Sequence, residues 1–391
     1  MTKHAKLSAS GASRWLNCPG SVQLESQFAD TSSVYAQEGT LAHEIAELKL
    51  SKWCKKGIGP KKFNSAMEKF KTHELYQPEM DKFTDEYVDF VKEKFMAYPS
   101  KPYIELEERV DFSNIVPEGF GTADCIMIFG NDLNIIDLKY GKGVPVSPVD
   151  NPQLMLYALG AYNNYSFIYD IKTVTMSIVQ PRLDVFESHT ISVDELLQFA
   201  DRVKPIADKA YNGSDEYKSG DHCKFCKAKS VCKARAAEMF AVVEDIKPVM
   251  ENGVGTLTPQ EIGYYLDKVD GVSKWISDLE DEGLILALNG EDVTGFKAVE
   301  GRSIRAFKDI DSAFNVLLAN GYDEAMLYER KPLTLSKIEK LVGKSIFSEM
   351  LKDEIVKPPG KPTLVRESDK REKIVNNDAN RMFNNLEKEG K

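Results

Sequence analysis

Two short apolar runs separated by a polar turn stand out near the middle of the chain. Residues 125–129 and 133–138 are apolar and β-prone, and Gly130-Asn131-Asp132 between them has the composition of a tight turn. The pattern predicts an antiparallel hairpin. Because residues two apart in a strand share a face, we expect Asp137 and Lys139 to point the same way and Leu138 to point into the opposite layer.

The predicted hairpin carries charged side chains next to apolar ones. Asp124 ends the stretch Gly121-Thr122-Ala123-Asp124 just before the first run, and Asp137 and Lys139 close the second. Burying two carboxylates and an ammonium group costs free energy unless the groups are paired or serve a function. A divalent metal held by the two acids, with the lysine beside it, is the use that we expect.

The rest of the first 240 residues alternates between helical and strand patterns. Helices are expected over residues 38–48, 61–98 with a break at Pro78, 151–161 and 192–211, and strands over residues 103–107 and 173–180. Together with the hairpin, this order predicts an α/β fold in which helices flank a mixed central sheet.

Three polar pairs on these elements have the spacing of a shared face. They are His43 with Glu47 and Gln153 with Tyr157 on helices, and Glu105 with Glu107 on a strand. Each has an ordinary structural explanation, such as a core histidine or a solvated acidic face. Glu107 is the one that could support the expected metal site.

Composition narrows the class of protein. The chain has 391 residues, enough for two or three domains, and a net charge of −10. That charge argues against a protein that coats nucleic acid, but not against an enzyme with a local basic channel. With no apolar run of membrane-spanning length and no signal-peptide pattern, we expect a cytoplasmic protein that makes no membrane contact.

The six cysteines do not form a disulfide framework in a chain of this kind, so their spacing needs another explanation. Cys223, Cys226 and Cys232 form a C-x2-C-x5-C run, which is typical of metal ligands. A fourth ligand is missing locally. His222 would complete a zinc site, whereas Cys18, at the end of a short N-terminal helix, would make four cysteines for an iron–sulfur cluster.

The pattern changes near residue 241, where a linker rich in Gly and Pro is expected. Residues 241–391 predict a smaller α+β region: a helix over residues 259–289, a strand–turn–strand over 295–307, short helices near 311–320 and 335–352, and a frayed tail. Arg302 and Arg305 flank the expected turn. With Lys142 they are the candidate cationic contacts for a partner outside the acidic centre.

The motifs, in their order along the chain, resemble those of RecB-type nucleases in the PD-(D/E)XK superfamily. The matching residues are His43 with Glu47, Glu107, Gly121-Thr122-Ala123-Asp124, Asp137-Leu138-Lys139 and Gln153 with Tyr157. The cysteine arrangement resembles the AddB-type branch of that superfamily, in which four cysteines hold a [4Fe-4S] cluster. The sequences of residues 118–124, 137–143 and 151–160 look closest to those of a phage- and prophage-encoded group without an assigned function.

The resemblance implies a PD-(D/E)XK nuclease domain over residues 1–240 and a metal-dependent deoxyribonuclease, expected to be an exonuclease, that acts in phage replication or recombination. Asp124, Asp137, His43 and the backbone carbonyl of Leu138 would hold Mg²⁺ or Mn²⁺. Lys139 would hold the attacking water, Glu107 would bind a second metal or orient a water, and Gln153 with Tyr157 would position Lys139 or the phosphate. Cys18, Cys223, Cys226 and Cys232 would hold the [4Fe-4S] cluster, with Zn²⁺ as the alternative.

The resemblance implies that the partner is DNA and that the protein acts in the cytoplasm of a phage-infected bacterium. Candidate further partners are a phage single-strand-binding protein, recombinase, helicase or polymerase. The protein could also form an oligomer. Two competing interpretations remain. One is a non-catalytic DNA-end-binding or assembly module on a nuclease fold, and the other is a zinc-stabilised interaction domain without a DNA role.

Overall fold

The computed structural model describes residues 5–29, 34–54, 57–244, 258–299 and 309–319, and residues 323, 327 and 350. The helices that precede the sheet are α1 (Ala12–Asn17), α2 (Ser21–Glu25), α3 (Val34–Trp53), α4 (Pro60–Lys71) and α5 (Glu79–Met96). The predicted break at Pro78 is confirmed, because this residue is the N-cap of α5.

A mixed sheet of five strands forms the centre of the fold. Its strands are β1 (Tyr103–Asp111), β2 (Phe120–Phe129), β3 (Asp132–Leu138), β4 (Thr173–Gln180) and β5 (Val185–Ser192), and they lie in this order. β3 and β4 are parallel, and the other neighbours are antiparallel. Helix α6 (Pro152–Tyr165) makes the crossover that a parallel pair requires.

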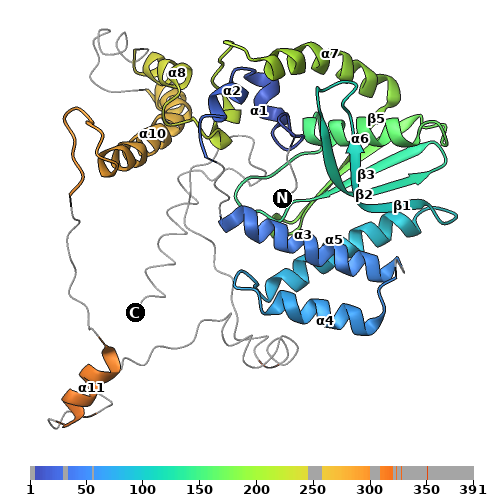
Figure 1. Cartoon of the computed structure of the whole chain (residues 1–391), viewed down its shortest axis with the longest axis horizontal. Helices are drawn as coiled ribbons and strands as arrows, with labels where there is room; N and C mark the ends of the chain where they lie inside the picture. Colours follow the sequence, from blue (N-terminus) through green and yellow to red (C-terminus); the bar gives the residue numbers. More distant parts are fainter. Residues whose placement is uncertain are drawn as a thin grey trace. The chain divides into compact units, whose positions relative to one another are not determined.

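Helices cover both faces of the sheet, as Figure 1 shows. On one face, α6, α7 (Val193–Asn212) and α1 enclose a large core that contains Trp15, Ile126 and Leu156. On the other face, α3 and α5 pack over a second core that contains Leu50 and Met127. The predicted α/β fold with helices on both sides of a mixed sheet is therefore confirmed.

The central hairpin forms as the sequence predicts. β2 and β3 are antiparallel with Cys125 opposite Ile136, and Gly130 in the turn has φ +58°. That left-handed conformation favours glycine, which carries no Cβ. Strand β5 was not predicted, because its sequence, Val185-Phe186-Glu187-Ser188-His189, alternates only weakly and its outer positions are exposed.

A short 3-10 helix, η1 (Pro181–Leu183), joins β4 to β5. Beyond α7 the described elements are all helices: η2 (Asp221–Phe225), α8 (Lys233–Glu244), α10 (Pro259–Leu288) and α11 (Ile310–Ala319). The predicted helices at residues 259–289 and 311–320 are confirmed. Residues 295–299 form no strand. The rest of the expected strand–turn–strand, with Arg302 and Arg305, and the short helix expected at residues 335–352 lie outside the described ranges, apart from residue 350.

The chain divides into two compact units, Met1–Val299 and Glu300–Lys391. The expected boundary at residue 240 falls inside the first unit. Arg235 and Lys229 both pair with Asp278 of α10, at 2.7 and 2.6 Å, and Ser230 donates to Glu282. These contacts join α10 to the segment that carries the cysteines. No helix in the described part is long and apolar enough to cross a membrane.

Candidate metal centre

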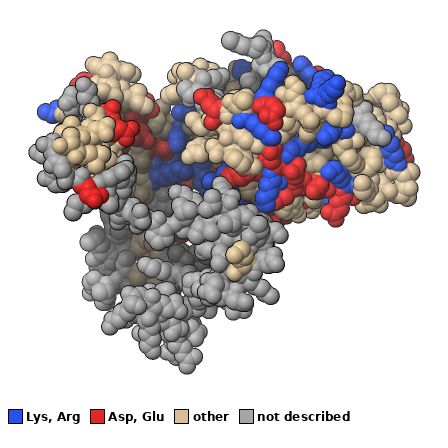
Figure 2. Space-filling view, turned by 90° about the horizontal axis from the view of Figure 1, so that it is seen from below, with Lys and Arg blue, Asp and Glu red and all other residues tan. Residues whose placement is uncertain are grey.

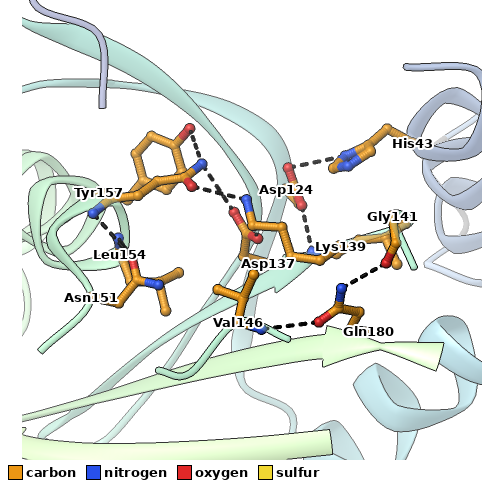
Figure 3. A network of polar contacts seen from close by, with 12 residues as sticks. His43, Asp124, Asp137, Lys139, Gly141, Val146, Asn151, Leu154, Tyr157 and Gln180 are labelled. Atoms are coloured by element: carbon orange, nitrogen blue, oxygen red, sulfur yellow. Dashed lines mark hydrogen bonds and ion pairs between the residues drawn. The ribbon is translucent and has the colours of Figure 1, made fainter. Parts of the chain in front are cut away.

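Neighbouring strands of the sheet bring the predicted site residues together (Figure 3). Asp124 lies on β2 and Asp137 on β3. Lys139 follows β3 directly, and its backbone N–H donates to Val179 O of β4 at 2.8 Å. The main chain around the lysine is therefore fixed by the neighbouring strand, independently of any side-chain contact.

Both oxygens of Asp124 are engaged. Oδ2 accepts a hydrogen bond from Leu138 N at 2.7 Å, and Oδ1 lies 3.3 Å from His43 Nδ1 on α3. Burial alone would raise the pKa of Asp124 and lower that of His43. The mutual attraction of the two groups reverses both effects, so the pKa of Asp124 lies below its usual value and that of His43 is raised to about 9.

A second chain of contacts orients Lys139. Its ammonium lies 2.9 Å from Asp137 Oδ2 and donates to Gln153 Oε1 at 2.9 Å, and Gln153 Nε2 lies 3.2 Å from Tyr157 Oη. Gln153 and Tyr157 are one helical turn apart on α6. Gly121 leaves room for the tyrosine, because a Cβ at this position would lie 2.5 Å from its ring.

Glu107 enters the site through an irregular backbone. Ile104, Leu106 and Val110 on β1 would share a face in a regular strand, yet the first two pack towards α3 and α5 and Val110 packs under α6. The alternation shifts at Glu107, which has φ +48°. Opposite, Ala123 and Cys125 of β2 also face different layers, with Asp124 between them.

This irregularity separates Glu107 from Glu105, with which the sequence pattern pairs it. Glu105 lies beside Tyr103, in the layer under α6, whereas Glu107 meets His43 and Asp124. A non-glycine residue in the left-handed region stores strain, and such residues cluster at functional sites. Burial, with the Asp124 carboxylate next in effect, raises the pKa of Glu107 to about 7.

His43, Glu107 and Asp124 form the one group of three candidate metal ligands found among the described residues. One donor atom from each lies within 4.8 Å of the others. An imidazole and two carboxylates suit Mn²⁺ or Mg²⁺, so the donor set fits the metal that the sequence predicts. The set differs from the predicted one, because Glu107 takes the place of Asp137.

Asp137 is instead turned towards the lysine. Its Oδ1 lies 3.4 Å from Gln153 Nε2, and its Oδ2 faces the ammonium without the geometry of a regular hydrogen bond. The side chain is almost fully buried, and burial raises the pKa of Asp137 against the opposing effect of Lys139. A buried carboxylate oxygen with a poorly directed partner is a group that a metal could recruit.

Two residues near the site gave no signal in the sequence. Gln180, at the end of β4, donates to Gly141 O and Val144 O and accepts from Val146 N. The Arg182 guanidinium lies over the Tyr140 ring at 4.7 Å and pairs with Glu79 at 3.0 Å and Glu38 at 3.6 Å. These contacts join segments far apart in the chain, which no local pattern reveals.

Comparison with known proteins places the chain in a family. The model of a family described as "Protein of unknown function (DUF2800)" matches residues 4–372. The chain belongs to the DUF2800 family. Among solved structures, one titled "Crystal structure of SSO0001" is 15% identical to this chain and has a TM-score of 0.27. The match spans 60% of this chain and 89% of the chain in that structure.

The cysteine region of this DUF2800 protein joins the N-terminus to the segment after α7. Lys218 N lies 3.4 Å from Cys18 Sγ, Gly20 N donates to Glu216 O, and Lys227 N donates to Glu25 Oε1. Cys18 and Cys226 are buried, and Cys223 and Cys232 are partly buried. His222, the alternative zinc ligand, has Nε2 at 2.8 Å from Lys218 O.

The expected DNA contacts are placed only in part. Lys142 is exposed and follows the site lysine by three residues, whereas Arg302 and Arg305 lie outside the described ranges. On the face drawn in Figure 2, positive and negative side chains are interspersed over the described surface. The described residues on this face therefore do not form a continuous positive channel. Any inference of DNA binding has to rest on contacts near the site.

Proposed function

We propose that this protein is a metal-dependent DNA nuclease with a PD-(D/E)XK core. The observation that supports this most is the convergence of Asp124, Asp137 and Lys139 on adjoining strands, with His43 and Glu107 within reach of one metal ion. Carboxylates that hold a divalent cation, next to a buried ammonium, are what hydrolysis of a phosphodiester requires.

The residues divide into two groups in this proposal. His43, Glu107 and Asp124 would hold the ion, with the Leu138 carbonyl and Asp137 as further ligands, and the imidazole would favour Mn²⁺ over Mg²⁺. A bound ion would neutralise charge that develops on the phosphate. Lys139 holds the attacking water and adds positive charge, while Gln153 and Tyr157 keep its ammonium in place.

The test is cleavage of end-labelled linear single- and double-stranded DNA, with Mn²⁺ or Mg²⁺, by protein purified without oxygen. Wild type should cleave, and Lys139→Ala and Asp124→Asn should lose at least about a hundredfold in rate. Lys172→Ala is the matched control, because that lysine is exposed and pairs with Asp170 at the far end of β4. Full activity of Lys139→Ala would overturn the assignment.

A negative result would also be informative. If wild type bound DNA ends but no metal supported cleavage, the non-catalytic end-binding module would become the better proposal. The label pattern of a positive result would give polarity and distinguish exonuclease from endonuclease action. Cleavage stimulated by a single-strand-binding protein, recombinase, helicase or polymerase would support a role in phage replication or recombination.

A further inference from the structure

The loop that joins β3 to α6 connects two halves of the candidate site. It leaves Lys139 at one end and reaches Asn151 at the other, where the Asn151 side chain caps α6 and accepts a hydrogen bond from Gln153 N. Since the Lys139 ammonium donates to Gln153 Oε1, the two ends of the loop meet across the site. The loop therefore forms part of the rim of the site.

One buried side chain holds the first half of this loop. Gln180 is 2% exposed, and its amide makes three hydrogen bonds to loop backbone: to Gly141 O at 2.6 Å, to Val144 O at 3.0 Å and from Val146 N at 3.1 Å. Figure 3 shows this connection beside the catalytic lysine. A buried amide satisfied by one loop fixes the loop in one conformation.

The hydrogen bond to Gly141 O also sets the direction of the next donor. In a trans peptide the C=O and the following N–H point in opposite directions. Because Gly141 O points at the buried Gln180, the N–H of Lys142 points away from it. Among the described residues, neither the Lys142 N–H nor the Gly143 N–H donates a hydrogen bond, and the Lys142 side chain is exposed.

The glycines on either side of Lys142 are not required by the fold. A Cβ at Gly141 or Gly143 would meet nothing within 4 Å, and neither residue has a positive φ. The protein itself therefore has room for side chains at both positions. Bare backbone beside an exposed lysine is what a closely approaching anion requires.

We propose that residues 141–143 bind the phosphodiester group that neighbours the cleaved phosphodiester on the same DNA strand. Gln180 is the positioning residue that holds this backbone segment in place. The inference rests on the proposed nuclease function and names a contact of the same site. Lys142 lies at most about 11 Å from Lys139 along the chain, so a phosphate close to the scissile group is the one within its reach.

Gly143→Ala gives the sharpest test, because the structure predicts that it leaves folding unchanged. We expect an unchanged Tm, a KM for DNA raised about tenfold and a kcat within about twofold of wild type. Gly59→Ala is the matched control: this glycine is also open and has an ordinary φ of −77°, but it caps α4. It should change neither constant.

Charge provides a second, independent readout. Lys142→Ala should lower the dependence of log Kd on log salt concentration by about one unit. A DNA with one neutral methylphosphonate next to the cleaved bond should bind wild type about tenfold more weakly, and Lys142→Ala should be insensitive to that replacement. In Gln180→Met, which keeps side-chain volume but loses the hydrogen bonds, Lys142→Ala should have little further effect on the salt dependence.

The outcomes separate this inference from the nuclease proposal. If wild type cleaves DNA but Gly143→Ala and Lys142→Ala keep its KM and salt dependence, the loop contact is wrong and the nuclease proposal stands. If wild type does not cleave, Kd values for the same variants decide: selective losses at Lys142 and Gly143 support the contact on a non-catalytic protein. Failure of wild type to bind any DNA overturns both.

Discussion

Individual acids in the site sit so close together that their protonation depends on one another. The negative charges of Glu107, Asp124 and Asp137 outweigh the effect of burial on His43 and raise its pKa to about 9. Burial, together with the charges of Asp124 and Asp137, raises the pKa of Glu107 to about 7. Near neutral pH and without a metal, His43 is therefore protonated, and Glu107 carries a proton in part of the molecules. A metal ion must displace these protons, so binding and pH are linked.

The direction of that linkage can be predicted. A group whose pKa is higher in the folded state stabilises the fold below its unfolded pKa and loses that contribution as pH rises. For Glu107 the loss runs from about pH 4.5 to 7, and for His43 from about 6.5 to 9. The metal-free protein should therefore lose stability across this range, while the stabilisation by Mn²⁺ should grow.

Thermal unfolding with and without Mn²⁺, at intervals from pH 5.5 to 9, would measure both trends. Glu107→Gln removes the lower of the two transitions and should flatten the metal-free curve below pH 7. His189→Asn is the control, because that histidine lies on β5 and belongs to no candidate metal group in the described chain. A Mn²⁺ shift that did not depend on pH would contradict the assigned ligands.

Gly121 shows how a motif residue can serve packing rather than chemistry. Adding a Cβ at this position would force it against the Tyr157 ring at 2.5 Å. We expect Gly121→Ala to lower the free energy of unfolding by about 1–3 kcal/mol, measured by urea denaturation. The same change should cost less in a Tyr157→Ala background, since the ring is then gone. Equal costs in both backgrounds would show that the clash is not the cause.

Among the secondary-structure elements, those with local signals could be predicted from sequence. The β2–β3 hairpin has a turn glycine between apolar runs, α7 begins at Ser192 with a capping box, and α6 carries Pro152 in its first turn. The left-handed conformation of Glu107 could not be predicted, since nothing in the neighbouring sequence requires it. The presence of Glu107 in the candidate ligand group could therefore not be read from the sequence pattern alone.

Long-range contacts between elements were equally hidden, and Arg182 is the clearest case. Its guanidinium joins α3 through Glu38, α5 through Glu79 and the residue after the site lysine through the Tyr140 ring. The three partners lie between 42 and 144 residues before it in the chain. Only the assembled fold shows that this arginine orders the helices around the site.

Arg182→Met should therefore destabilise the protein more than a surface ion pair would. The arginine side chain is 8% exposed, and its removal leaves Glu38, which is 19% exposed, without its partner. We expect a loss of about 1–3 kcal/mol by urea denaturation, with the partial exposure of Glu79 keeping it below the cost of a fully buried pair. Lys92→Ala, which breaks a surface pair with Asp89, should cost under about 0.5 kcal/mol.

Across the whole first unit, the N-terminal segment closes onto a region about 200 residues later. Cys18 and Glu25 bond to Lys218 and Lys227, and Arg14 pairs with Glu25. Closing so long a loop costs conformational entropy that these non-covalent contacts have to offset, and a metal clip is a stronger way to hold it. We propose that a [4Fe-4S] cluster on Cys18, Cys223, Cys226 and Cys232 strengthens the link, with zinc as the alternative.

If the cluster is structural, its loss should leave the metal centre working. Protein purified without oxygen should be brown and contain about four iron atoms. Cys18→Ala and Cys226→Ala should lose the iron and lower Tm by several degrees, yet keep the Mn²⁺-dependent shift, because the candidate metal group in the described chain, His43, Glu107 and Asp124, includes none of the four cluster cysteines. Cys125→Ser controls for a buried cysteine outside the cluster and should keep the iron.

One zinc in colourless protein would support the alternative. Without any metal, only polypeptide contacts such as those of Glu25 and Gly20 would hold the N-terminus, and Glu25→Ala would then cost more than Cys18→Ala.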